Sequence, residues 1–308
     1  MRDRLSALRT RLQEARARWV PGSLPGQPAP GFEGAPAGRV AAVVSRPAGP
    51  RAGGSAAEPA VGPFVPPGGP DADEVGALAE AAGALRIGEA GPWLAPLVTD
   101  PAPAIRAGAL AGLALLGGEG VAERLAPALA NPDRAVRTAA AHGLSRLGPR
   151  GVPALAAAAA RSADDPEWLV ALARALGGTA APEAVPALTA LLDGPAAAPA
   201  AAALGHLGAP AAPLVAALGR AGPGAQVEII DALAQLGAAE AAAPLTDQLC
   251  ADRPDVRAAA ARALGKLRYE GASARLEALR SDYYGRVRRA AVEALSKLPT
   301  AGARGRGP

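Results

Sequence analysis

The chain has 308 residues, of which 50% are apolar and only 3% aromatic, and its formal net charge is +4. One cysteine excludes an internal disulfide, and with two histidines a Cys/His zinc site is not available, so we expect no metal and no other cofactor. No run of eighteen apolar residues is present, and the first twenty residues lack the apolar stretch of a secretory signal. We therefore expect no membrane span, and we expect the protein to be cytoplasmic.

Residues 1–20 predict a basic amphipathic helix. Leu5, Leu8, Leu12 and Trp19 fall on one side of such a helix, and six arginines against two acids give the segment a net charge of +4. A helix of this kind suits docking on a partner protein, docking back on the rest of the chain, or peripheral contact with an anionic membrane. The candidate contact residues are Arg9, Arg16 and Trp19.

Residues 21–73 contain 23 proline and glycine residues among 53, a composition that predicts a disordered linker. Phe32 lies inside it, in the sequence APGFEGAP. An isolated aromatic residue in such a segment either anchors a short recognition motif or has no role. Phe32 is kept as a candidate partner contact.

Residues 74–299 repeat one template eight times. If each copy is aligned on the leucine eight places after its Val or Ile position, the spacings are 28, 31, 32, 28, 29, 31 and 31 residues. The aligned residues are Leu85, Leu113, Leu144, Leu176, Leu204, Leu233, Leu264 and Leu295. A period near thirty residues predicts an all-α solenoid of about seven to eight helical hairpins.

The template predicts a helix, a turn and a second helix. Val136, Ala140 and Leu144 lie on one stripe of the first helix, and Asn131 precedes that helix where a short polar side chain caps free amides. Glycines end the first helices: Gly117, Gly148, Gly208 and Gly237. Prolines are expected near the start of the second helices: Pro96, Pro127, Pro153, Pro186, Pro213 and Pro244.

The copies DPAPAIRAGALAGLALLGG from Asp100 and RPDVRAAAARALGKL from Arg253 resemble the HEAT-like repeats of the phycobilisome lyase group, and the resemblance covers roughly residues 75–298. Members of that group follow the pattern Asp-Pro-x-x-Val-Arg-x-x-Ala-Ala-x-Ala-Leu-Gly. The resemblance implies that the arginine after each Val or Ile is structural and pairs with carboxylates between repeats. These arginines are Arg106, Arg137, Arg257 and Arg288.

Charge is distributed unevenly along the array. Residues 178–250 have a net charge of −5, whereas residues 251–308, with a basic tail at 300–308 that is expected to be disordered, have +7. The basic end offers candidate partner contacts at Arg286, Arg288 and Arg289. An alternative function is nucleic-acid binding through the basic N- and C-terminal ends, because Tyr283 and Tyr284 lie beside these arginines and aromatic rings near arginines stack on bases. The other interpretation of the C-terminal charge is the polar surface of a terminal repeat.

No catalytic constellation is evident. His142 and His206 fall at positions where other repeats carry exposed polar residues, and Cys250 is expected to be a buried thiol. Trp168 occupies a Val position and is expected in the core. We therefore expect a non-catalytic protein, with a bilin-lyase-type enzyme or accessory subunit as an alternative implied by the resemblance.

The template is weakest in residues 195–240. Pro199 falls inside a first helix, which should start late, and Glu228 replaces a small residue, so we expect a flexible acidic segment that bends or receives a basic partner. The sequence thus predicts a scaffold or adaptor that binds another protein along the solenoid surface. The concave face, expected to be lined by second helices, is the predicted contact surface.

Overall fold

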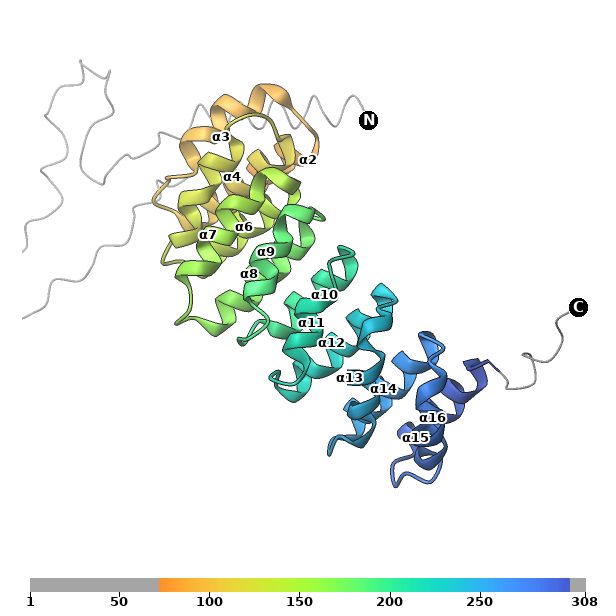
Figure 1. The fold of residues 1–308 in the computed structure, drawn as a ribbon. Coiled ribbons are helices and arrows are strands. Elements are labelled where there is room, and N and C mark those ends of the chain that lie inside the picture. The colour runs from red at the N-terminus through yellow and green to blue at the C-terminus, as the bar shows by residue number, and fades with distance from the viewer. Residues whose placement is uncertain (1–71, 300–308) are drawn as a thin grey trace, which may run out of the picture.

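The computed structural model describes residues 72–299, and these form fifteen α-helices, α2 to α16, joined by turns and short 3-10 segments without a β-strand among them. The helices stack side by side into an elongated array (Figure 1). The predicted all-α solenoid is confirmed. The predictions for residues 1–20 and for the tail 300–308 lie outside the described residues. The predicted linker 21–73 also lies outside them, except for Ala72 and Asp73, which are helical and begin α2.

The even-numbered helices carry the template and are called first helices. Their bounds are α2 Ala72–Ala84, α4 Pro103–Leu116, α6 Arg134–Arg146, α8 Pro166–Gly178, α10 Ala197–His206, α12 Pro223–Leu236, α14 Pro254–Lys266 and α16 Gly285–Lys297. The odd-numbered helices are called second helices. Their bounds are α3 Gly91–Leu97, α5 Val121–Leu125, α7 Val152–Arg161, α9 Val185–Ala190, α11 Ala212–Leu218, α13 Ala242–Asp247 and α15 Ser273–Leu279.

The apolar stripe of each first helix forms the core. Val136, Ala140 and Leu144 are all fully buried, and Trp168 is 7% exposed at its Val position, as the template predicts. Small residues between the large ones let neighbouring first helices approach closely: a Cβ at Gly108 would lie only 2.1 Å from the carbonyl oxygen of Gly76.

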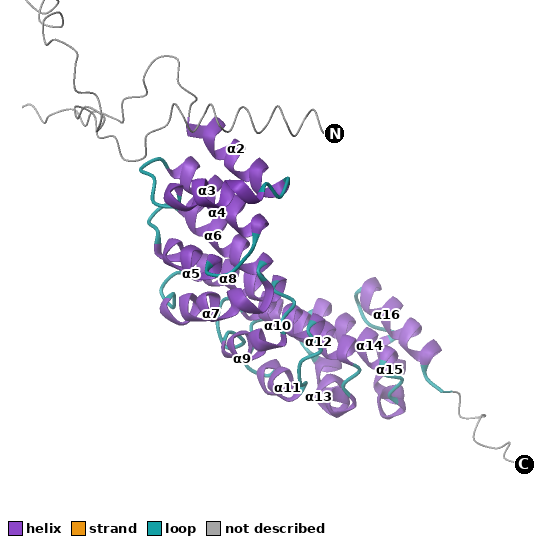
Figure 2. Ribbon diagram, turned by 90° about the horizontal axis from the view of Figure 1, so that it is seen from above, coloured by secondary structure: helices purple, strands orange, loops and turns teal. Residues whose placement is uncertain are grey.

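First helices line the inner side of the bend, and the second helices lie on its outer side (Figure 2). The prediction that second helices line the concave face is therefore wrong. The physical reason lies in the packing: first helices meet backbone to backbone at glycine and alanine, as at Gly83 and Gly112, so that layer has the shorter spacing and falls on the inside of the curve.

Each second helix packs on the first helix that follows it in the chain, as α3 does on α4, α7 on α8 and α15 on α16. The hairpin units are therefore α3–α4 through α15–α16. Helix α2 precedes them, and no second helix comes before it in residues 72–299.

A left-handed residue follows each first helix from α2 to α14, whereas α16 is followed by Leu298 in an extended conformation. Gly117, Gly148, Gly208 and Gly237 have φ between 62° and 69°, which confirms their predicted role. Arg86, Ala180 and Arg268 occupy the same turn in the other repeats with φ of 51–52°. L-residues rarely adopt this conformation, because Cβ comes too close to the next carbonyl oxygen.

The first repeat is aligned differently from the prediction. Leu85 is 42% exposed, so its assignment to the core is wrong. Because Arg86 corresponds to Gly117, the residue equivalent to Leu113 is Ala82, which is fully buried and lies 31 residues before it.

Two of the prolines predicted near helix starts lie elsewhere. Pro96 is the sixth residue of α3, whose first turn holds Pro92, and Pro127 follows α5 in the 3-10 segment Ala126–Ala130. Pro153, Pro186 and Pro213 stand in the first turns of their helices as predicted. Proline thus occurs both in the first turn of second helices and in a 3-10 segment that follows one.

Helix α10 starts late, as predicted. It has 10 residues, whereas α12 has 14, and it begins after Ala196, the residue at its Val position. Pro199 falls in its first turn, where proline is tolerated because the amide has no intrahelical acceptor. The repeat that contains α10 is therefore shorter than the next repeat at its first helix.

Candidate partner-binding surface

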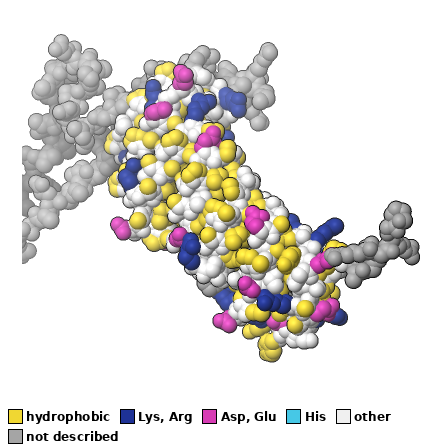
Figure 3. All heavy atoms as spheres, in the orientation of Figure 1, with side chains coloured by type: hydrophobic (Ala, Val, Ile, Leu, Met, Phe, Trp, Pro, Cys, Tyr) yellow, Lys and Arg dark blue, Asp and Glu magenta, His cyan; other side chains and the backbone are white. Residues whose placement is uncertain are grey.

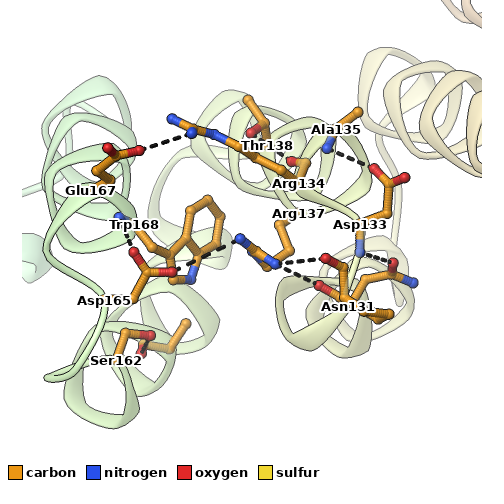
Figure 4. A network of polar contacts seen from close by, with 12 residues as sticks. Asn131, Asp133, Arg134, Ala135, Arg137, Thr138, Ser162, Asp165, Glu167 and Trp168 are labelled. Carbon is orange, nitrogen blue, oxygen red and sulfur yellow. Dashed lines mark hydrogen bonds and ion pairs between the residues drawn. The ribbon is translucent and has the colours of Figure 1, made fainter.

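The template arginines tie four first helices, α4, α6, α14 and α16, to the turns that precede them. Nη1 of Arg137 donates to the carbonyl oxygens of Asn131 at 3.0 Å and Pro132 at 3.1 Å (Figure 4). The same paired contacts recur in three other repeats, at Arg106, Arg257 and Arg288. Each arginine thus satisfies two carbonyl groups of the turn from the preceding second helix.

Carboxylates of the next repeat approach two of these arginines. Arg257 binds Asp282 through Nε at 2.9 Å and Nη2 at 3.2 Å. Nη2 of Arg137 lies 3.9 Å from Asp165, and the guanidinium stacks over the ring of Trp168 at 5.3 Å (Figure 4). These contacts join consecutive repeats, as the resemblance implies for the template arginines.

Burial acts to raise the pKa of Asp282, but hydrogen bonds from Arg257 and from the amide of Tyr284 outweigh it, and the pKa is lowered. At the surface, the hydrogen bond from Arg253 lowers the pKa of Asp255 to about 2. The hydrogen bond from Lys297 likewise lowers the pKa of Glu293. All three carboxylates are therefore charged at neutral pH.

The first helices leave a hollow of about 520 Å³ where α10 is short. Ala198, Pro199 and Ala202 of α10 line it between α8 and α12. Ala202 occupies the position that carries Arg174 in α8 and Asp231 in α12, so no long side chain of α10 reaches into the hollow. The hollow is open to solvent, and α8, α10 and α12 place it on the inner side of the bend.

Polar side chains stand around this hollow. Arg174 comes from α8, Glu228 from α12 and His206 from the end of α10, and all three are exposed. Nδ1 of His206 lies 3.0 Å from Nε2 of Gln235. The hollow therefore combines an apolar floor with a cation on one side and a carboxylate on the other. Glu228 was a sequence candidate, whereas Arg174 was missed because it matches the ordinary polar position of its repeat.

The C-terminal end presents a second charged region. Arg286, Arg288 and Arg289 are exposed, although Nη1 of Arg288 is used by the carbonyl groups of Asp282 and Tyr283. The guanidinium of Arg286 lies 6.0 Å from the ring centre of Tyr284, and Tyr283 is 88% exposed. Of these three arginines, Arg286 and Arg289 donate no hydrogen bond of this kind to the turn.

The remaining sequence candidates are placed as follows. Arg9, Arg16, Trp19 and Phe32 lie outside the described residues. Both histidines are exposed, as expected. Cys250 is exposed, so the prediction of a buried thiol is wrong; it ends a 3-10 turn, where Leu249 takes the buried position instead.

One face of the array is largely apolar across its middle, with scattered charges (Figure 3). A second open hollow of about 600 Å³ lies between α7 and α9 and is lined mainly by alanine, including Ala160 and Ala187. Within residues 72–299, no group of three or more His, Cys, Asp or Glu side chains is arranged to hold a metal ion. Over the same range, no helix is both long enough and apolar enough to cross a membrane.

Stacked hairpins joined only to their neighbours define the class of α-solenoid repeat proteins. Models of HEAT repeats match residues 70–145, 90–173 and 211–296, more than half of the chain. The protein belongs to the HEAT-repeat family. The HEAT-like character expected from the template is confirmed.

Three solved structures are similar in fold. An engineered protein has 21% identity and a TM-score of 0.44, covering 74% of this chain and 75% of that one. Human deoxyhypusine hydroxylase in complex with glycerol has 22% identity and a TM-score of 0.27, with 74% and 80% covered. The complex of CpcE and CpcF of phycocyanin lyase from Nostoc sp. PCC7120 has 20% identity and a TM-score of 0.35, with 78% and 100% covered. No curated protein sequence matches the chain.

Proposed function

We propose that the protein is a non-catalytic scaffold that binds a partner protein along the inner face of the solenoid, centred on the hollow above α10. The observation that carries this proposal is the hollow itself. At the position of Ala202, other first helices carry long polar side chains such as Arg174 and Arg262, and α10 alone among the central repeats leaves the space empty.

The lining indicates the chemistry of the partner. Alanine and proline at the floor favour an apolar side chain, while Arg174 on one side favours an acidic group and Glu228 on the other a basic one. A short protein segment that presents an apolar residue between an acid and a base meets all three conditions. Asp231, exposed one turn after Glu228, adds to the acidic side.

The test fills the hollow without disturbing the fold. Arginine at position 202 matches the residue that α8 carries at the same position, so Ala202→Arg should fold normally. Ala111→Arg is the matched control, because Ala111 occupies the same position in α4, away from the hollow. Full-length wild type and both variants are used to capture proteins from the native cell extract, with mass spectrometry as the readout.

We expect a partner captured by the wild type and by Ala111→Arg to be lost with Ala202→Arg. Equal capture by all three proteins contradicts the proposed site. Thermal unfolding of the two variants provides the folding control.

Nucleic-acid binding through the C-terminal end is the second candidate function. The observation that favours it is the exposed Tyr283, which packs edge-on against Tyr284, whose ring in turn lies beside Arg286. Oligonucleotide binding that weakens steeply with salt and is abolished in Arg286→Ala/Arg289→Ala would support this candidate. Binding unaffected by the double substitution would remove it.

A further inference from the structure

Helix α2 lacks a covering that the next first helices have. A Cβ at Gly112 of α4 would lie 3.0 Å from Leu94 of α3, and one at Gly143 of α6 would lie 2.6 Å from Leu125 of α5. In both cases the leucine belongs to the second helix that precedes the first helix. This side of a first helix is therefore normally sealed by the preceding second helix.

The equivalent residue of α2 is Ala81, 31 residues before Gly112, and no second helix precedes α2 in residues 72–299. Ala77 and Ala84 on the same helix are exposed, and Leu85 at its end is 42% exposed. The equivalents of Leu85 in later repeats, such as Leu116 and Leu147, are half-buried. Helix α2 thus presents an apolar strip that the repeat pattern covers elsewhere.

Acidic residues accompany this strip. Asp73, Glu74 and Glu80 are all exposed on α2, and Glu74 stands at the position that holds Ile105 and Val136 in the following repeats. A carboxylate at this position favours a covering segment with positive charge. It does not favour another repeat, which would place aliphatic side chains there. Arg86, after the helix, is the one cation nearby in sequence.

We propose that residues 1–20 of the same chain cover this strip and form the N-terminal cap of the solenoid. Their predicted helix has an apolar side with Leu5, Leu8 and Leu12 and a net charge of +4, complementary to the apolar strip and acidic residues of α2. A flexible chain of the length of residues 21–71, which is what their composition predicts, would span roughly 40 Å, enough for residues 1–20 to reach α2. Solenoids need such a cap because their terminal repeats otherwise expose core surface.

Amide hydrogen exchange on the full-length protein tests this cap. Leu8→Asp/Leu12→Asp places two carboxylates on the apolar side of the segment, outside the array, so α4 to α16 remain folded. Exchange of the α2 amides between Leu78 and Ala84 should accelerate at least tenfold in this variant, while α14 amides keep their wild-type rates.

The matched control is Val43→Asp/Val44→Asp, which adds the same charge to the intervening segment and should leave α2 exchange unchanged. Equal α2 rates in the wild type and in Leu8→Asp/Leu12→Asp would overturn the cap. A wild-type α2 rate that falls as protein concentration rises would also overturn it, because a second copy would then supply the covering.

Discussion

Arg257 and Asp282 join consecutive repeats through two hydrogen bonds in a largely buried pair, with side chains 13% and 9% exposed. Arg106 and Arg137 occupy the same position in earlier repeats, but each has a buried Nε without a partner. The residues equivalent to Asp282 are there Asn131 and Ala163. The Nε of Arg257 therefore has a carboxylate partner in the next repeat, which the Nε atoms of Arg106 and Arg137 lack.

Asn131→Asp should restore this tie at Arg106. Its Oδ1 already accepts from the amide of Asp133, as Asp282 does from Tyr284, so the side chain is held in the required place. We expect the free energy of unfolding to rise by about 1 kcal/mol, since a hydrogen bond to a charged group satisfies a buried donor. Urea denaturation measures the gain. In an Arg106→Lys background the gain should disappear, and an equal gain there would contradict the pairing.

Asp282→Asn should lower the free energy of unfolding by about 3 kcal/mol at neutral pH, because it leaves Arg257 buried without its carboxylate. The control is Asp247→Asn, which removes an exposed pair with Arg275 and should cost less than about 1 kcal/mol. Similar losses in both variants would show that burial of the Arg257–Asp282 pair has no energetic consequence.

The same pair predicts a pH dependence. The pKa of Asp282 in the folded protein lies below its ordinary value of 3.8, so its contribution is complete above that value and is lost as the pH falls through the folded pKa. The stability difference between wild type and Asp282→Asn should therefore be constant from neutral pH down to about pH 5 and shrink below about pH 4. Urea midpoints across this range provide the measurement. A stability difference that grows on acidification would contradict a lowered pKa of Asp282 in the folded protein.

Gly112→Ala should destabilise the array by about 2 kcal/mol through overpacking. A Cβ at Gly112 would lie 2.3 Å from the carbonyl oxygen of Ala79, and backbone atoms cannot move aside as a flexible side chain does. Gly224→Ala is the comparison, because no atom lies within 4 Å of its Cβ and alanine favours the helix. Chemical denaturation of both variants should show loss in the first and none in the second.

Ala180→Gly should stabilise the protein by about 0.5–1 kcal/mol. Ala180 has φ of 51°, so glycine relieves the left-handed strain, although the added freedom of the unfolded chain offsets part of the gain. Gly237→Ala, at the equivalent turn with φ of 66°, should have the opposite sign. Calorimetric unfolding of the two variants measures both effects. Unchanged stability in both would show that the left-handed conformation at this turn has no energetic cost for alanine.

Amides of α10 should exchange with solvent faster than those of α6 and α14. The helix has 10 residues, carries Pro199 in its first turn and has only small or short apolar side chains, alanine and proline, along the floor of the hollow. Hydrogen exchange followed by mass spectrometry gives the comparison. Protection equal to that around Leu144 and Leu264 would contradict the prediction that residues 195–240 are flexible.

Local signals in the sequence predicted the repeat, the left-handed glycines, the core position of Trp168 and the late start of α10, because each depends on residues within one or two helical turns. Features that depend on neighbouring repeats were harder to predict. Leu85 has the spacing of an anchor, yet Ala82 is the buried residue because the turn at Arg86 fixes the alignment.

The candidate site shows the same division. Glu228 was recognisable because it breaks the template, but Arg174 matters only through its distance from α10 across the hollow, which no single repeat encodes. The assignment of the inner face failed for a related reason: curvature follows from the relative spacing of two helical layers, and Gly112 and Gly143 affect that spacing only through the helices they touch.

The short α10 also has a consequence for how the molecule comes apart. In a linear array each repeat is held only by its neighbours, so cooperativity extends no further than the strongest continuous run of interfaces. The hairpin α9–α10, predicted above to be the least protected, divides that run into α2–α8 and α11–α16. Heating should therefore melt the protein as two blocks rather than as one, with the block that contains Arg257 and Asp282 melting at the higher temperature.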